Sequence, residues 1–340
     1  MIVDRYYYHQ LNKSEQTIYK TFYDGVMEYK QIIPIPVKSI SQEQFTKIYA
    51  AITRDNPLIY HMNQSACNLA TDGLGHTAIC PQYFFSKAKV KEYNRKIEKA
   101  VNELVAQLKL TEGTDYDKAI RVHDWFCRNV EYDMQGADMN EPARVIASHN
   151  IIGVFAHHRA QCEGIAKAVK VILNAVDVRC IVATGTANGK RENGPHAWNI
   201  VNLDNTPYHM DVTWDIGAQT DNFRKISYDY FNVSDELISI DHIAEGKLPE
   251  CRSLKLNYFT KNKIAFSSKT LLLAYIVKMV GMGQKELYFR LEGKLNKSSV
   301  LNKAINSITE IMNQMGYRQI RVQQIPNENI GTYWMRIQIR

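Results

Sequence analysis

Residues 161–214 constrain the fold more than any other stretch, because a long apolar helix pattern is followed directly by strand patterns. From Gln161 to Val176, apolar residues recur at the i, i+3, i+4, i+7 spacing of a buried helix face: Ile165, Ala166, Val169, Ile172, Leu173 and Val176. β-rich runs bounded by turn residues follow at Val178–Thr186, His196–Leu203 and Pro207–Trp214. The sequence therefore predicts a mixed α/β (α+β) fold in which this helix packs on an antiparallel sheet.

The remainder of the chain forms flanking segments with helix and strand patterns of their own. We expect an N-terminal α/β segment over 1–110, a central core over 111–250 and a basic C-terminal α+β module over 251–340. The last module reads as β–α–β–α–β–β, with its first strand at 255–266.

The formal charge of +7 is unevenly distributed along the chain. From residue 252 onward there are 15 Lys and Arg, 4 Glu and no Asp, so this stretch carries +11 and the preceding part −4. This asymmetry fits an acidic partner for the C-terminal module, and it equally fits a solvated basic face. Aromatic residues interleave with charges in KELYFRLEGK, but no recognised nucleic-acid-binding motif is present, so we do not expect a nucleic-acid ligand.

The sequence lacks the patterns of membrane-spanning, disulfide-rich and zinc-binding proteins. No apolar run approaches the roughly 18 residues that a membrane helix needs, so we expect no membrane span. The opening MIVDRYYYHQ lacks signal-peptide features, so we expect a cytoplasmic location, with export of a longer precursor as the alternative. The cysteines are too sparse for a disulfide scaffold and form no C-x-x-C pair, and we expect no metal or cofactor. They are Cys67, Cys80, Cys127, Cys162, Cys180 and Cys251.

Cys162 stands in the first turn of the apolar helix, where unpaired N–H groups and the helix dipole favour negative charge. Such a position favours the thiolate, which is the nucleophilic form of cysteine. A nucleophilic thiol also needs a base within hydrogen-bond reach and a group that orients the base. His196 and Asp211 are the candidates, because they fall in the two predicted strands that follow the helix.

The relative position of His196 and Asp211 depends on the turn between their strands. A two- or four-residue turn centred on Asp204-Asn205 pairs His196 with Thr213, and Asp211 then lies diagonal to His196 on the same face. A register shifted by two residues would place them directly opposite each other, whereas a three-residue loop would send one of them to the other face. The sequence thus allows a His–Asp pair without requiring it.

Three motifs in this order resemble the core of the transglutaminase-like superfamily: RAQCEGIAKA, GPHAWNIV and YHMDVTWD. The resemblance covers about 115–240, and the first segment is more diffusely similar to the N-terminal region of bacterial multi-domain members. It implies a papain-like cysteine core over 111–250, in which the helix bearing the cysteine packs on the antiparallel sheet. Carried over, Cys162 is the nucleophile, His196 the base and acid, and Asp211 the orienting acid.

Other site residues are less well defined. The backbone N–H of Cys162 is the natural first donor to an oxyanion. The candidates for a second donor are Gln161, Tyr132, His158, Asn150 and Trp125. Trp198 and Trp214 are expected in the core or on the wall of the cleft, and Asp215 is the alternative to Asp211 as the triad acid.

The resemblance implies a cysteine-dependent hydrolase or acyltransferase that acts on peptide or amide bonds through a thioester. A peptidase or amidase acting on a protein or peptide is favoured over a crosslinking transglutaminase. The sequence departs from the family where Ile165 replaces a frequent aromatic residue and where FAHHRAQC replaces a Gly-rich approach. The alternative is therefore a catalytically inactive domain of this kind that serves as a protein- or polyanion-binding module.

Overall fold

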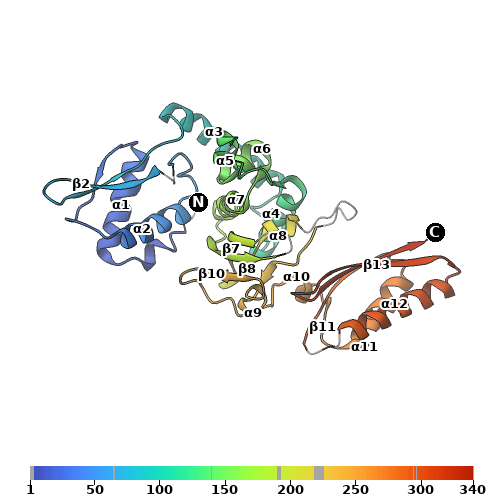
Figure 1. The fold of residues 1–340 in the computed structure, drawn as a ribbon. Coiled ribbons are helices and arrows are strands. Elements are labelled where there is room, and N and C mark those ends of the chain that lie inside the picture. The colour runs from blue at the N-terminus through green and yellow to red at the C-terminus, as the bar shows by residue number, and fades with distance from the viewer. Residues whose placement is uncertain are drawn as a thin grey trace. The chain divides into compact units, whose positions relative to one another are not determined.

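The apolar helix and the antiparallel strands predicted for residues 161–214 are both present in a computed structural model of the chain (Figure 1). The structure describes residues 4–63, 66–138, 140–189, 193–217, 226–293, 295 and 297–339. The chain divides into two compact units, residues 1–230 with 242–251 and residues 231–241 with 252–340. The segment boundaries expected near residues 110 and 250 stay predictions.

The central sheet of the first unit is antiparallel, with neighbouring strands in the order β10-β6-β7-β8. These strands are β6 (Cys180–Asn188), β7 (Asn193–Leu203), β8 (Thr206–Met210) and β10 (His242–Ala244). A two-residue turn joins β7 to β8, and its residues Asp204 and Asn205 have φ of 51° and 62°. Positive φ at both positions is typical of the tight hairpin turn that Asp and Asn tolerate. The register pairs Leu203 with Thr206, so one of the registers left open by the sequence is the one observed.

The strand predicted over Pro207–Trp214 is wrong in its second half. β8 ends at Met210, and the chain turns into α8 (Val212–Gly217). Asp211 caps this helix, because its Oδ1 accepts a hydrogen bond from the Trp214 N–H at 3.2 Å. A capping carboxylate satisfies a free N–H of the first helical turn, and this outweighs the strand propensity of the residues that follow.

Helix α7 (Cys162–Ala175) lies between the sheet and the other helices of this region (Figure 1). Its glycine, Gly164, allows a neighbouring segment to approach, since a Cβ there would lie 2.5 Å from the Ser148 carbonyl oxygen. The surrounding elements are α3 (Lys87–Gln107), α4 (Asp115–Asn129), β4 (Glu131–Tyr132), α5 (Pro142–Ser148), α6 (Ile151–His157) and β5 (Arg159–Ala160).

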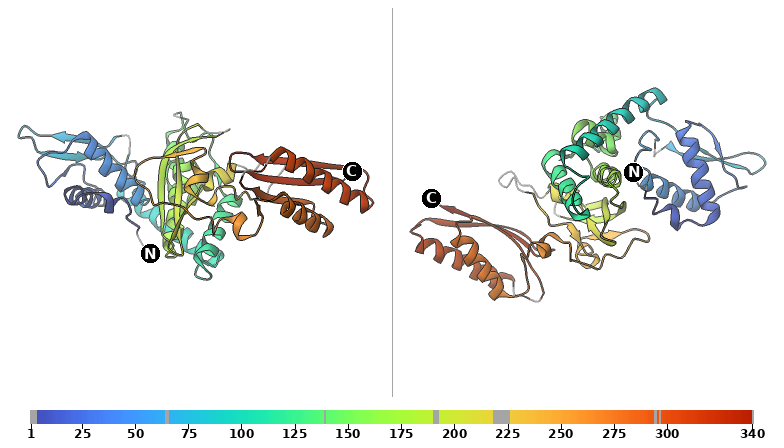
Figure 2. Two further views of the ribbon diagram at one scale, coloured as in Figure 1. Left: turned by 90° about the horizontal axis from the view of Figure 1, so that it is seen from below. Right: turned by 180° about the vertical axis from the view of Figure 1, so that it is seen from behind.

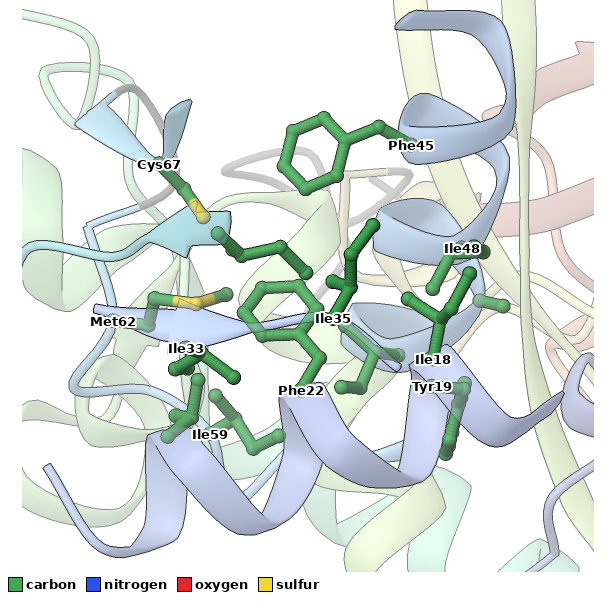
Figure 3. Packing of buried hydrophobic residues seen from close by; sticks show 14 of the residues in the cluster. Ile18, Tyr19, Phe22, Ile33, Ile35, Phe45, Ile48, Ile59, Met62 and Cys67 are labelled. Atoms are coloured by element: carbon green, nitrogen blue, oxygen red, sulfur yellow. The ribbon is translucent and has the colours of Figure 1, made fainter. Parts of the chain in front are cut away.

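The N-terminal part of the first unit has a hydrophobic core of its own (Figure 3). Ile18 and Phe22 of one helix, Phe45 and Ile48 of another, and Ile33 of the small sheet meet there. The elements are η1 (Tyr8–Gln10), α1 (Lys13–Met27), β1 (Ile33–Pro34), α2 (Gln42–Asp55), β2 (Asn68–Thr71) and β3 (Thr77–Cys80). Both helices begin with a capping box, in which a side chain and a backbone N–H three residues apart bond reciprocally.

The second unit contains a four-stranded sheet in the order β11-β12-β14-β13, with two helices covering one face (Figure 2). Its elements are β9 (Phe231–Val233), α9 (Asp235–Ile238), α10 (Tyr258–Lys261), β11 (Ala265–Phe266), α11 (Lys269–Gly281), β12 (Glu286–Leu291), α12 (Lys297–Gln314), β13 (Ile320–Asn327) and β14 (Thr332–Ile339). From β11 onward the predicted β–α–β–α–β–β order is confirmed. The long first strand at 255–266 is wrong, because Asn257 caps α10 by accepting from the Phe259 N–H and leaves only two strand residues.

In the part of the chain that the structure describes, no helix combines the length and the apolar character needed to cross a bilayer.

Candidate active site

His196 and Asp211 form a buried hydrogen-bonded pair at one end of the central sheet. His196 lies in β7, and Asp211 directly follows β8. The His196 Nε2 and the Asp211 Oδ2 are 2.8 Å apart, and neither side chain has solvent exposure. The β7–β8 register is the one expected from a two-residue turn, but β8 ends at Met210, so Asp211 meets His196 from the residue that follows the strand and not from a strand position diagonal to it.

The protonation of this pair follows from its surroundings. Burial alone would raise the pKa of Asp211, but His196 and then His242 hold it well below the usual carboxyl range. Asp211 is therefore an anion at neutral pH and can only accept hydrogen bonds. It follows that His196 carries its proton on Nε2 and presents Nδ1 as its basic nitrogen.

The Asp211 carboxylate accepts three hydrogen bonds in all. Oδ2 accepts from His196 and also from the Nε2 of His242, at 3.1 Å, while Oδ1 caps α8 through the Trp214 N–H. Its own backbone N–H donates to the Tyr230 carbonyl at 3.1 Å. Both the main chain and the side chain of Asp211 are thus fixed, as an orienting acid requires.

Cys162 is the first residue of α7 and is half-buried. It packs against Ala166, Val182 and Ala197, and Ala197 is the neighbour of His196 in β7. The thiol is therefore held on the α7 side of β7, against the residue that follows His196 in the strand. A direct contact between Cys162 Sγ and His196 Nδ1 stays a prediction.

A buried asparagine fastens the start of α7 to the sheet. The Asn199 side-chain nitrogen donates to the Ala166 carbonyl at 2.9 Å and to the Ile181 carbonyl at 3.1 Å. Side chains alternate along a strand, so Asn199 and Ala197 face α7 together. This bond limits movement of the first turns of α7, and hence of Cys162, relative to His196.

The acidic residue next to Cys162 is neutralised locally. The Glu163 carboxylate lies 2.5 Å from the Lys167 Nζ and 3.6 Å from the His149 Nδ1. Burial works against its ionisation, but Lys167 and His149 lower the pKa of Glu163 to about 2. Because the negative charge is paired, it opposes a Cys162 thiolate less than an unpaired carboxylate would.

Two of the candidate oxyanion donors are placed near the start of α7. One of them precedes Cys162 in the chain, and the other lies on a strand that pairs with the segment before Cys162. Gln161 is the N-cap residue of α7, and its side-chain amide points to the Asp133 carbonyl at 3.4 Å instead of capping the helix. Tyr132 pairs with Ala160 between the short parallel strands β4 and β5, two residues before Cys162. Their role as donors stays a prediction.

Trp198 and Trp214 both lie against His196, but in different settings. Trp198 is buried behind the imidazole, with ring centroids 6.1 Å apart, and its indole N–H donates to the Nδ1 of His209 at 3.0 Å. Trp214 is half-buried and packs on both His196 and His242, with centroids 5.8 and 4.4 Å away. Trp198 is thus a core residue, and Trp214 covers the His–Asp pair.

His242 is the site residue that the sequence reasoning missed. It enters from β10, and it joins His196 and Asp211 only because β10 pairs with β6. The nitrogen and oxygen atoms of the three side chains lie within 4.8 Å of one another, a spacing that a metal ion could use. Hydrogen bonds of 2.8 and 3.1 Å account for the arrangement, and we assign no metal to it.

Asp215, the alternative triad acid, belongs to a second buried His–Asp pair. Its Oδ2 lies 3.0 Å from the Nε2 of His123, and its Oδ1 accepts from the Ser227 hydroxyl at 2.8 Å. Burial raises the pKa of Asp215 to about 6 despite the imidazole beside it. This pair connects α4 to α8. Because Asp211 caps α8, the pair helps to fix the position of the helix next to Asp211.

Asp215→Ala is expected to lower the free energy of unfolding by about 3–5 kcal/mol, because it leaves a fully buried imidazole and a buried hydroxyl without their acceptor. Chemical denaturation would measure the loss. The matched control is Glu103→Ala, which breaks an exposed ion pair with Lys99 and should change stability by less than about 0.5 kcal/mol. A loss below about 1 kcal/mol for Asp215→Ala would contradict a structural role for the pair.

Comparison with known proteins finds a family match for the part of the chain that carries Cys162, His196 and Asp211. Residues 102–212 match the profile of the transglutaminase-like superfamily. Kyphoscoliosis peptidase from Mus musculus is 22% identical over 175 residues, which cover 48% of this chain and 26% of that protein, and the Homo sapiens protein matches to the same extent. The matched stretch thus spans about a quarter of the length of these relatives. A solved structure, the crystal structure of a TGase, is 16% identical and covers 69% of this chain and 65% of its own, with a TM-score of 0.33. On the profile match and the two peptidase matches, residues 102–212 are a transglutaminase-like superfamily domain with distant homology to kyphoscoliosis peptidase.

Proposed function

We propose that the chain is a cysteine-dependent hydrolase that cleaves peptide or amide bonds, with Cys162 as nucleophile, His196 as base and acid, and Asp211 as orienting acid. The observation that carries the proposal is the buried 2.8 Å bond between His196 Nε2 and Asp211. This bond leaves the imidazole with a basic Nδ1 in the strand against which Cys162 packs.

The proposed reaction proceeds in two steps. His196 Nδ1 takes the Cys162 thiol proton, the thiolate attacks the carbonyl carbon, and the imidazolium returns the proton to the leaving amine as the C–N bond breaks. Water then attacks the thioester carbonyl while His196 accepts its proton. The acid product leaves, and the proton returns to the Cys162 sulfur. Asp211 stabilises the imidazolium in both steps.

Hydrolysis is proposed over crosslinking because the curated relatives carry the name peptidase. The match spans about a quarter of their length, so a protein or peptide substrate is itself part of the proposal. The basic module at 252–340 is proposed to contact an acidic partner, since its net charge is opposite in sign to that of the preceding chain.

Alkylation by iodoacetamide at pH 6 tests the nucleophile without a known substrate. We expect Cys162 to react at least about 10-fold faster than Cys80, because an ordinary thiol with a pKa near 8.5 is almost fully protonated at that pH. Cys80 is the internal control, since it is the other half-buried cysteine among the described residues. His196→Ala should bring the two rates together, as measured by mass spectrometry of the modified peptides.

Equal rates in the unmodified protein would overturn the proposal and favour a domain that binds without catalysis. Assays with substrates then distinguish hydrolysis from acyl transfer to an amine. Fluorescent casein and a quenched peptide library, each with and without an added primary amine, should show amine-independent cleavage. Product formation only when the amine is present would instead establish a transamidase.

A further inference from the structure

One carboxylate oxygen serves two imidazoles in this site. Asp211 Oδ2 accepts from His196 Nε2 at 2.8 Å and from His242 Nε2 at 3.1 Å, and all three side chains are shielded from solvent. A histidine that only fills core space does not require a charged acceptor. His242 therefore affects how strongly the Asp211 carboxylate interacts with His196.

The sheet is built to bring the two histidines together. β7 and β10 flank β6, where His196 pairs with Gly185 and His242 with Ala187. These two positions lie on the same face of β6, and the missing side chain of Gly185 and the methyl group of Ala187 leave room for both rings. A Cβ at Gly185 would collide with the Ile243 carbonyl of β10, so glycine there permits the close approach of β10.

Aromatic rings enclose the pair and hold the second histidine in place. The Trp214 ring lies 4.4 Å and the Trp198 ring 5.2 Å from the His242 ring centroid. The titratable groups that face His242 include Asp211 after β8, His196 from β7, and Tyr230, whose ring is 5.6 Å away. In such a shielded setting, a hydrogen bond to a carboxylate redistributes charge more effectively than it would in water.

We infer that His242 is a positioning residue of the proposed triad: it fixes Asp211 Oδ2 and takes a share of its negative charge, and so sets the basicity of His196. The inference rests on the proposed function for its catalytic meaning. Its physical content is a coupling between two imidazoles through one oxygen. Without the second donor, Oδ2 would accept from His196 alone, and more of the carboxylate charge would stabilise the His196 imidazolium.

Two substitutions separate the donor of His242 from its ring. His242→Phe keeps an aromatic ring against Trp214 and removes the N–H donor, whereas His242→Gln keeps an N–H donor and removes the ring. NMR titration of His196, assigned by the signal lost in His196→Gln, measures its pKa directly. We expect His242→Phe to raise the His196 pKa by roughly one unit. Asp211 would lose its hydrogen bond from His242, and its carboxylate would then stabilise the protonated form of His196 more strongly. His242→Gln should stay within roughly 0.3 units of the unsubstituted protein.

The same variants are followed by thermal unfolding and by the pH dependence of Cys162 alkylation. An unchanged His196 pKa in His242→Phe with only a lower Tm would overturn the inference and leave His242 a packing residue. A rise of the His196 pKa by roughly one unit in His242→Gln would also overturn the inference, because this variant keeps an N–H donor. This result can be obtained even if His242→Phe does not fold.

Two further measurements distinguish the role inferred for His242 from a metal site and from the proposed function. Zinc chloride added at micromolar concentration should leave the His196 and His242 signals in place. If both shift together and the titration of His196 disappears, the cluster is a metal site and the inference fails. Slow alkylation of Cys162 in the unsubstituted protein would overturn the proposed function alone, because the NMR measurement of the two-imidazole coupling does not depend on it.

Discussion

Replacing Cys162 by alanine is expected to lower the rate of peptide hydrolysis by at least about 10⁴-fold, because the covalent step has no other nucleophile at the start of α7. The residual rate would come from substrate binding and oxyanion stabilisation alone. The side chain is half-buried and packs against Ala166, Val182 and Ala197, so the folded state should lose less than about 1 kcal/mol. Hydrolysis of fluorescent casein, set beside a thermal unfolding curve, measures both effects.

Cys80→Ala is the control for the loss of a half-buried thiol. It lies in β3, in the N-terminal part of the first unit, and should leave hydrolysis within about twofold of the unsubstituted protein. If Cys162→Ala retained more than about a tenth of the activity, the nucleophile would have to be sought elsewhere. An equal loss in both variants would indicate a general effect on folding.

The part of this site that the sequence predicts is the part made by local structure. Helix α7 follows from its apolar spacing, which puts Cys162 at a helix start. The Asp204-Asn205 turn gives the β7–β8 hairpin one of the registers that the sequence left open for a His196–Asp211 pair. Where the separation is short and the turn chemistry is specific, spacing reduces the possible placements of two side chains to a few registers.

The missed parts depend on contacts between distant segments. His242 reaches Asp211 through a three-residue strand whose partners in β6 lie 55 to 59 positions earlier in the chain, and no local pattern marks such a strand. The His123–Asp215 pair joins residues 92 positions apart, and a histidine on an apolar helix face gives no sign of which carboxylate it will meet. The early end of β8 was missed for a different reason, since one capping bond from Asp211 overrode strand propensity.

Asp211→Asn is expected to lower the rate of hydrolysis by about 10³–10⁴-fold while preserving the fold. The side chain must keep an acceptor toward the Trp214 N–H to cap α8, and asparagine has only one oxygen. Its NH₂ group then faces His196 and His242, so His196 must present the lone pair of Nε2 and carry its proton on Nδ1. Nδ1, the nitrogen proposed to take the Cys162 proton, would then no longer be basic, even though each side chain keeps its place. The pH profile of hydrolysis and the NMR tautomer signature of His196 measure this change.

Asp215→Asn is the matched comparison, because it makes the same chemical change at an equally buried residue of α8. Asp215 bonds to His123 and Ser227, so its substitution should act on stability and leave the tautomer of His196 unchanged. Hydrolysis per folded molecule is then expected to stay within about tenfold. If Asp215→Asn removed activity and Asp211→Asn did not, the orienting acid would be Asp215, and the His196–Asp211 bond would be structural. The opposite result would assign the two His–Asp pairs separate roles, one in proton transfer and one in holding α8 against α4.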